Sequence, residues 1–274
     1  TGATLKWFDL DDEGRILANT ADEVITERTK IVAVTHVGNT TGAITDIAPI
    51  VKRAHEVGAV VVLDACQSVP HLKIDFHALD VDFAAWSAHK MYGPTGVGFL
   101  YGKREMLEAL PPANFGGSMV ELAWMDQEAQ YMAPPARFEA GTQPVAQVVA
   151  AGVAAEWLMN IGMENLEAHE RVIAGELLKM GQIEGVRILG PHANEQRIGT
   201  VAFEIEGVHP HDVGQFIDAQ GIAIRVGHHC AQPVHRHFGV YASNRASSGI
   251  YNCVEDAQAL VEALKKVRPF FGVK

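Results

Sequence analysis

The feature that most constrains the fold is an alternation of short apolar segments with a helical one in the first hundred residues. Four apolar segments have the length and composition of buried strands: residues 31–37, 59–63, 83–87 and 97–101. Between the first two we expect a helix, capped by Thr45 or Asp46 and with Pro49 in its first turn. Strand, helix and strand at this spacing predict an α/β fold with a mostly parallel sheet.

The second half of the chain has a different pattern, which predicts a smaller α+β module. Two long helices are expected, over residues 145–159 and 163–182. The segments expected after them are strands at 186–189 and 200–205, a helix at 210–220, a strand at 222–226 and a terminal helix at 254–267. We therefore divide the chain near residue 160, into a large domain of residues 1–160 and a small domain of residues 161–274.

Charge and composition argue against several classes of function. The 274-residue chain has a net charge of −11 and no basic stripe, which argues against nucleic acid as its main partner. Its three cysteines are far apart in the sequence, which is typical of a reducing compartment. The longest apolar stretch, residues 148–159, is shorter than the roughly 20 residues that cross a bilayer, and no secretory leader is visible. We expect a cytoplasmic protein without a membrane span.

Lys90 follows a predicted strand, at the kind of position where α/β proteins bind ligands. It precedes a Gly-Pro-Thr-Gly turn and is a candidate Schiff-base amine, although an ordinary surface lysine fits this segment equally well. Ser87 and His89, beside it, offer a hydroxyl and an imidazole to a phosphate group. The segment thus has the residue types that a phosphorylated cofactor needs.

Asp64 ends another predicted strand, and Gln67 lies three residues further on. A buried carboxylate at this position would keep a pyridine nitrogen protonated, and an amide could hydrogen-bond to the phenolate oxygen of the same ring. Taken alone, the two residues fit a turn cap and a solvated side chain better. Together with Lys90 they favour a pyridoxal phosphate (PLP) site.

Cys230 directly follows His228 and His229 on a glycine-flanked segment, which could favour a reactive thiolate. A buried small hydrophobe or a zinc ligand are the alternatives. Adjacent residues rarely bind one metal ion and the chain has no Cys-x-x-Cys pair, so we expect no metal site. Cys66 and Cys253 lie among apolar residues and are expected to pack in the interior.

In combination, these motifs resemble the Suf-type (group II) cysteine desulfurases, which are fold-type I PLP enzymes. The segments that carry the resemblance are Leu63-Asp64-Ala65-Cys66-Gln67, Trp86-Ser87-Ala88-His89-Lys90, Gly227-His228-His229-Cys230-Ala231-Gln232-Pro233, Arg245-Ala246-Ser247 and Tyr251-Asn252. The resemblance covers essentially the whole chain. Members of the family are longer at the N-terminus by roughly a third, so it implies that an N-terminal third is missing and that the large domain is partial.

The resemblance implies a cofactor role for the residues at the predicted strand ends. Lys90 would hold PLP through a Schiff base, and Asp64 would pair with the pyridinium nitrogen. Gln67 would contact the phenolate oxygen, while Ser87 and His89 would hold the phosphate.

It also implies a substrate site and a homodimer. Thr142, in a Glu-Ala-Gly-Thr segment, would reach the phosphate in the neighbouring subunit. Arg245 would bind the carboxylate of the substrate, with Asn39 close to both the cofactor and that carboxylate. Arg225 would be a second contact to the anion, although a solvated charge at a strand end explains it equally well.

The implied reaction converts L-cysteine to L-alanine and leaves the sulfur on Cys230 as a persulfide, for transfer to a carrier and iron–sulfur cluster assembly. The alternatives are a selenocysteine lyase, a cysteine-sulfinate lyase or a non-catalytic fragment that binds a sulfur-carrier scaffold. In the branch served by a SufU-type zinc scaffold, a histidine at the position of His211 engages the zinc, so we favour that partner over a SufE-type acceptor. His209-Pro210 also fits a plain helix start.

The sequence departs from the family pattern in three segments. Ala88 replaces a glycine and Cys253 replaces a threonine. Ser248-Gly249 replaces a larger apolar pair, which predicts a looser backbone next to Arg245.

Overall fold

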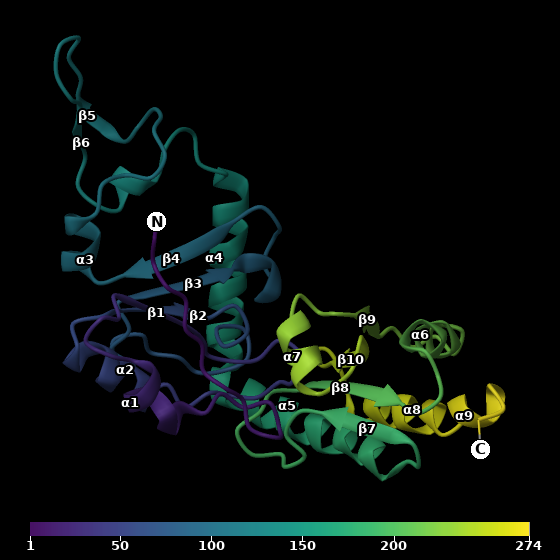
Figure 1. The fold of residues 1–274 in the computed structure, drawn as a ribbon. Helices are drawn as coiled ribbons and strands as arrows, with labels where there is room; N and C mark the ends of the chain where they lie inside the picture. Colours follow the sequence, from purple (N-terminus) through teal and green to yellow (C-terminus); the bar gives the residue numbers. More distant parts are fainter. Residues whose placement is uncertain (274) are drawn as a thin grey trace.

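Four strands from the first half of the chain form one sheet, in the order β1-β2-β3-β4. They are β1 (Ile31–Thr35), β2 (Val60–Asp64), β3 (Phe83–Ser87) and β4 (Gly98–Gly102). Strands β1, β2 and β3 run parallel, and β4 is an antiparallel edge strand (Figure 1). The structure is a computed structural model and describes residues 1–273. It confirms the predicted α/β fold with a mostly parallel sheet.

Short helices cover one side of this sheet. They are the 3₁₀ helix η1 (Ala18–Thr20), α1 (Ala21–Val24) and α2 (Ala48–Glu56). Ile50 and Ala54 of α2 are fully buried in the core that also contains the β1 and β2 side chains. The N-cap of α2 is Ile47, so the expected cap is wrong by two positions for Thr45 and by one for Asp46. The Asp46 carboxylate still accepts a hydrogen bond from the Ala48 N–H (3.2 Å).

The chain after β3 makes several short elements. They are η2 (Ala88–Lys90), α3 (Arg104–Ala109), β5 (Val120–Leu122), β6 (Gln130–Tyr131) and η3 (Ala136–Phe138). Strands β5 and β6 form a hairpin that projects away from the sheet (Figure 1). Trp124 and Met125 of this hairpin are exposed.

Two long helices follow, α4 (Val145–Ile161) and α5 (Met163–Leu178), and η4 (Lys179–Gln182) continues the second. They meet at an angle of 78° across Gly162, whose φ of +88° favours glycine. Leu158 and Leu166 pack beside Met91 and so tie both helices to the end of the large sheet. Within residues 1–273, no single helix is long and apolar enough to span a membrane, although the bent pair reaches that length and composition when joined.

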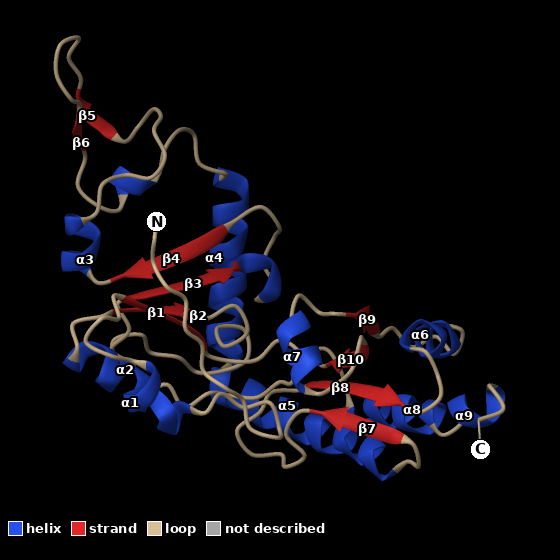
Figure 2. Ribbon diagram, in the orientation of Figure 1, coloured by secondary structure: helices blue, strands red, loops and turns tan. Residues whose placement is uncertain are grey.

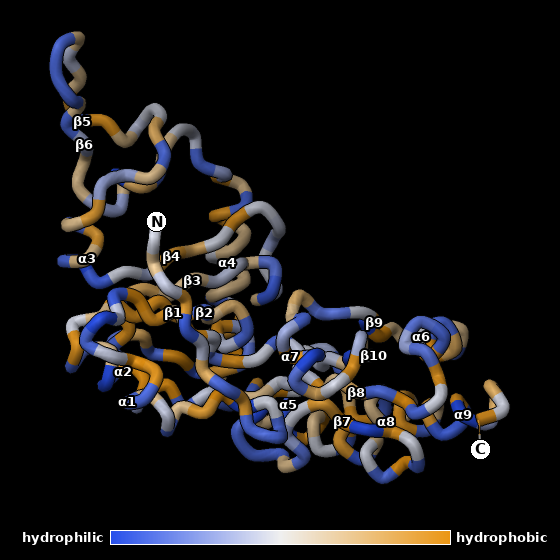
Figure 3. Tube along the Cα trace, in the orientation of Figure 1, coloured by the Kyte–Doolittle hydropathy of each residue, from blue (hydrophilic) through white to orange (hydrophobic). Residues whose placement is uncertain are grey.

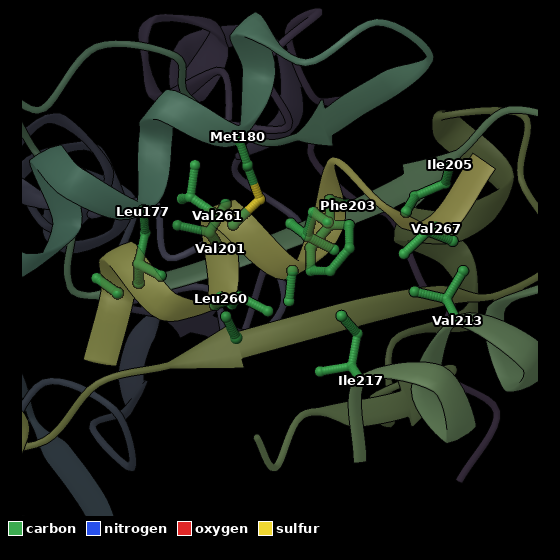
Figure 4. Packing of buried hydrophobic residues seen from close by; sticks show 14 of the residues in the cluster. Leu177, Met180, Val201, Phe203, Ile205, Val213, Ile217, Leu260, Val261 and Val267 are labelled. Carbon is green, nitrogen blue, oxygen red and sulfur yellow. The ribbon is translucent and has the colours of Figure 1, made fainter. Parts of the chain in front are cut away.

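The remaining strands form an antiparallel sheet in the order β7-β8-β10-β9. They are β7 (Val186–Leu189), β8 (Thr200–Ile205), β9 (Arg225–Gly227) and β10 (Ser243–Ser247), and the helices around them are α6 (Pro210–Asp218), α7 (Gln232–His237), α8 (Val254–Leu264) and α9 (Val267–Phe270) (Figure 2). Alternate residues of β8 face opposite sides. Val201 and Phe203 face α5 and α8 (Figure 4), whereas Ala202 joins the cluster next to α7.

Two corrections concern this second sheet. The strand expected at 222–226 lies at Arg225–Gly227, and β10 was not expected. Strand β10 has the sequence Ser-Asn-Arg-Ala-Ser, which carries no apolar alternation, and it forms because β8 and β9 pair with both of its edges. Arg245 therefore lies in a regular strand, and the looser backbone expected from Ser248-Gly249 is not observed at Arg245.

Each sheet has its own buried core. One contains the residues of β1, β2 and α2, and the other contains those of β8, α5 and α8. Figure 3 shows apolar stretches both at β1 and β2 and around α8. From these two cores we propose that the domains divide near residue 160, close to the α4–α5 bend.

Candidate active site

Side chains from β2 and β3 converge at the carboxyl edge of the large sheet. Asp64 is the last residue of β2, and its backbone pairs with Ala85 of β3. The half-buried Cys66 marks the convergence. Its backbone N–H donates to the Asp64 carboxylate (2.9 Å) and its thiol contacts the Ala85 carbonyl (3.9 Å), while Asp64, Ser87 and Lys90 are all close enough to shift the pKa of the thiol. Burial and then Asp64 raise the pKa of the Cys66 thiol, while Lys90 and Ser87 oppose this rise. The structure thus brings a carboxylate, a hydroxyl and an amine around one point.

This edge is open in the described part of the chain. Asp64, His89 and Lys90 are exposed, and Gln67 is half-buried. We expected a buried carboxylate at Asp64, and the structure differs because no element among residues 1–273 covers the end of β2. Cys66 was expected to pack in the interior, but it is half-buried among these polar side chains.

Asn39 connects this edge to the small module. It follows β1, whose extension beside β2 is fixed by a hydrogen bond from the His36 N–H to the Asp64 carbonyl (3.1 Å). The Asn39 side-chain amide donates to the His229 carbonyl (2.5 Å), and the Arg245 guanidinium donates to the Asn39 carbonyl (2.9 Å). One residue therefore holds the end of β1, the segment around Cys230 and the arginine of β10 together.

Arg245 and Arg225 lie directly opposite each other on β10 and β9. Among residues 1–273, neither forms an ion pair with a carboxylate, and the Nε atom of Arg245 is buried without a hydrogen-bond partner. Burial, and then the charge of Arg225, lower the pKa of Arg245. Two adjacent guanidiniums repel each other unless an anion lies between them, so the pair is suited to binding a carboxylate.

Cys230 is exposed at the turn after β9. His229 and Cys230 have φ angles of +50° and +61°, a left-handed conformation that is costly for residues other than glycine. The His229 ring is buried, and burial, followed by the charges of Arg245 and His235, lowers its pKa to about 4. The turn thus presents a free thiol on a strained backbone beside a neutral imidazole.

Two predicted site residues lie apart from this group. Thr142 is exposed just before α4, and none of the described hydrogen bonds joins it to the other candidates. His211 is exposed in the first turn of α6, where its ring stacks on that of His209 (centroids 5.6 Å apart). His209 is the N-cap and accepts a hydrogen bond from the His211 N–H, which confirms the expected helix start with Pro210 at its first position.

The sequence analysis missed two residues that contact the Cys230 turn. The rings of His229 and His235 both hydrogen-bond to the buried Ser243 hydroxyl, at 3.1 and 2.9 Å. Ser243 is fourteen residues from His229, so only the pairing of β10 with β9 brings them together and no local sequence pattern signals the contact. Cys253 differs from expectation as well, since it is exposed and caps α8 rather than packing in a core.

The donor set at the sheet edge fits PLP. A lysine amine, a carboxylate and a hydroxyl converge there, as the shared contacts of Cys66 indicate. Two surface hollows lie elsewhere, one lined by residues 185–187 and 204–208 and the other around Pro49. Within residues 1–273 no group of three or more His, Cys, Asp or Glu side chains is arranged to hold a metal ion.

Comparisons with known proteins identify the relatives of this chain. A probable cysteine desulfurase 2 from Mycobacterium leprae is 48% identical over 99% of this chain and 64% of its own length. A probable cysteine desulfurase from Streptomyces coelicolor is 47% identical over 99% of this chain and 65% of its own length. The chain spans somewhat less than two thirds of the length of these relatives.

Solved structures agree with this likeness. The crystal structure of the cysteine desulfurase CsdA (S-sulfonic acid) from Escherichia coli matches with a TM-score of 0.90 and 36% identity, over 95% of this chain and 64% of CsdA. The apo cysteine desulfurase from Thermococcus onnurineus matches with a TM-score of 0.92 and 32% identity, over 97% and 66% of the two chains. The family model for class-V aminotransferases matches residues 1–260, and the chain therefore belongs to the aminotransferase class-V family.

Proposed function

We propose that the protein is a PLP-dependent cysteine desulfurase of the Suf type, which forms L-alanine from L-cysteine and carries the sulfur on Cys230. The observation that carries the proposal is the linkage through Asn39, which joins the Lys90 edge to both Arg245 and the Cys230 turn. The relatives named cysteine desulfurase, at up to 48% identity, support the same activity. Iron–sulfur cluster assembly in the cytoplasm is the proposed setting.

The sheet edge is the proposed cofactor site. Lys90 would hold PLP covalently, Asp64 would contact its ring nitrogen and Gln67 its phenolate oxygen. When bound, the cofactor supplies an electron sink for the bonds at the substrate Cα. Ser87 and His89 would hold its phosphate. The Lys90 amine would also accept the proton from the substrate Cα and return it, which is the acid–base role of a lysine at this position.

The arginine pair is the proposed site for the substrate carboxylate. Arg245 is half-buried and has a buried Nε atom free for a hydrogen bond, so it can make a bidentate contact with a carboxylate. Arg225 would add charge, and Asn39 would fix the position of Arg245. Because Asn39 contacts both Arg245 and the His229 carbonyl, a carboxylate held here would place the substrate near the Cys230 turn.

Cys230 is the proposed sulfur acceptor. Its thiolate would attack the substrate sulfur, so that an S–S bond forms as the substrate Cβ–S bond breaks. L-cysteine and the enzyme thiol together yield L-alanine and the enzyme persulfide, so atoms and electrons balance without an external oxidant. The exposure of Cys230 then allows a carrier thiol to collect the sulfur by exchange.

The exposed surface of α4 supports a homodimer. Six apolar residues of this helix are exposed: Val145, Val148, Val149, Val153, Trp157 and Met159. Apolar patches of this kind mark interfaces, and the patch begins three residues after Thr142. We propose that a second copy covers α4, which would bring Thr142 to the cofactor phosphate of its neighbour. Light scattering of the protein and of a Val149→Glu variant tests this, since a wild-type monomer would contradict the proposal.

His211 is the proposed contact for a SufU-type zinc scaffold. It is exposed on the first turn of α6, where its ring can reach a partner. His211→Ala should lower sulfur transfer to such a scaffold and leave transfer to a small thiol unchanged. If the wild type and His211→Ala transferred sulfur to the scaffold equally well, a SufE-type acceptor would be favoured instead.

The experiment that tests the function is sulfur transfer by Cys230→Ala. We expect formation of the protein persulfide and delivery to an acceptor to be lost in this variant, while Cys66→Ala retains both. A variant that still released sulfite from cysteine sulfinate, or selenide from selenocysteine, at the wild-type rate would favour a cysteine-sulfinate or selenocysteine lyase. If the wild-type protein bound the scaffold but did not convert L-cysteine, it would be a non-catalytic partner of that scaffold.

A further inference from the structure

Three buried polar side chains form a hydrogen-bonded chain beneath the Cys230 turn. His235 Nδ1 contacts the Ala231 carbonyl at 2.9 Å, and His235 Nε2 contacts the Ser243 hydroxyl at 2.9 Å. The same hydroxyl contacts His229 Nε2 at 3.1 Å. His229, His235 and Ser243 are all at most 4% exposed. The chain therefore begins on the residue before Cys230 and ends on the carbonyl of the residue after it.

The direction of each hydrogen bond follows from the groups involved. A carbonyl oxygen can only accept, so the proton between His235 and Ala231 is on His235 Nδ1. In a neutral imidazole the other nitrogen is then an acceptor, so Ser243 donates to His235 Nε2. The single proton of the Ser243 hydroxyl is thereby used, and the hydroxyl must accept from His229 Nε2–H.

This order gives the two histidines opposite tautomers. His229 carries its proton on Nε2, and its Nδ1 atom is buried and has no hydrogen-bond partner. His235 carries its proton on Nδ1. A proton added to His235 Nε2 would put two donors against Ser243 and leave the hydroxyl proton without an acceptor. A proton added to His229 Nδ1 would leave the bonds of Ser243 unchanged, but it would create a buried charge without a hydrogen-bond partner. The chain of bonds therefore requires a neutral His235, and burial favours a neutral His229.

The Cys230 turn needs such support because its backbone is strained. His229 and Cys230 both have left-handed φ angles, which are unfavourable for residues other than glycine. The hydrogen bond from the Ala231 N–H to the His228 carbonyl (2.8 Å) closes the turn but does not join it to the sheet. Ser243 lies in β10, two residues before Arg245, so the chain of bonds fixes the turn to the strand that carries the arginine.

We propose that Ser243 and His235 are positioning residues, which act through His229 and Ala231 to hold Cys230 in its left-handed conformation next to Arg245. The two residues do not touch the proposed reacting atoms. The inference extends the proposed role of Cys230, but its physical basis is independent of PLP and of turnover. It assigns a task to Ser243 and His235 that their sequence neighbourhood does not indicate.

The first test is the tautomeric state of both rings. Long-range ¹⁵N–¹H correlation spectra of the ¹⁵N-histidine-labelled protein distinguish the Nδ1–H and Nε2–H forms. His229→Gln and His235→Gln assign the two signals. We expect the Nε2–H form for His229 and the Nδ1–H form for His235 at pH 7.5. The Nε2–H form for His235, or a charged His235 ring, would overturn the proposal.

The second test removes the central hydroxyl. Ser243→Ala should increase amide hydrogen exchange in residues 228–235 about tenfold or more, since the hydrogen bonds to both histidine rings are lost. In this variant the His229 ring should no longer be held in a single tautomer. Ser247→Ala is the matched control, because Ser247 lies on the same strand and its hydroxyl accepts from Thr200.

The exchange pattern separates positioning from general destabilisation. Faster exchange confined to residues 228–235, with β8 unchanged, supports the proposal. Faster exchange throughout β8 and β10 would mean that Ser243 merely stabilises the sheet and would overturn it. If Cys230→Ala leaves sulfur transfer intact while both tests succeed, the proposed function fails and the positioning role stands.

Discussion

The buried ring of His229 makes a quantitative prediction for stability in acid. Its pKa is lowered from 6.5 to about 4 in the folded protein, mainly by burial. The unfolded chain therefore binds more protons between these values, so stability is complete above pH 6.5 and is lost as the pH falls toward 4. For this one group the loss between pH 7 and pH 4.5 is at most about 2.4 kcal/mol. Solvent screening of the neighbouring charges reduces our expectation to roughly 1–2 kcal/mol.

The perturbation is His229→Gln, which removes the titrating group. The assay is urea unfolding followed by circular dichroism at pH 7 and pH 4.5, for the wild type and the variant. Carboxylates contribute to the pH dependence of both proteins, so their effects cancel in the comparison. The variant should be less stable at pH 7 yet lose roughly 1–2 kcal/mol less on acidification. Ser247→Ala should keep the wild-type pH dependence. Equal losses in wild type and His229→Gln would refute the argument that the buried ring is neutral.

The other predictions concern the substrate site, the sulfur acceptor and the large core. Arg245→Gln should raise the KM for L-cysteine about 10- to 100-fold, while Arg225→Gln, which alters the exposed arginine, should raise it less than about tenfold. Steady-state kinetics would contradict the assignment if Arg225→Gln raised the KM more than Arg245→Gln. Cys230→Ala should lower sulfur transfer to a protein acceptor at least about 100-fold without loss of cofactor binding, as measured by acceptor persulfide and absorbance. Asp82→Asn should lower the free energy of unfolding in urea by about 2–3 kcal/mol, because the buried Asp82 carboxylate accepts from the Val61 N–H (2.7 Å) and pairs with Lys103 (3.0 Å). A decrease below about 0.5 kcal/mol would show that this pairing is dispensable.

The large sheet could be predicted well from the sequence because its strands are short and apolar. The central strand β2 lies within one residue of its expected position, and β3 matches it at both ends. The two long helices also match, apart from the change to a 3₁₀ turn at Lys179. In each case the apolar pattern within the element itself predicts that it is buried.

The elements that were missed form for reasons that lie outside their own residues. Strand β10 is polar and is held by its neighbours, and the β5–β6 hairpin carries exposed side chains. The convergence of Asp64 and Lys90 follows from the parallel pairing of β2 and β3, and the sequence predicted a mostly parallel sheet with both residues at strand ends. The contacts of Ser243 and Asn39 with the Cys230 turn depend on how the two modules and the strands of the small sheet pack, which no local pattern encodes.

The central claim is that Lys90 holds PLP, and chemical trapping tests it most directly. The protein is incubated with PLP, reduced with borohydride, digested and mapped by mass spectrometry, with Lys90→Ala as the variant and Lys73→Ala as the control. Lys73 is an exposed lysine paired with Glu164, outside the proposed site. The account predicts label on Lys90 in the wild type and in Lys73→Ala, and none at a specific site in Lys90→Ala. Stoichiometric label on another lysine, or undiminished label in Lys90→Ala, would contradict it.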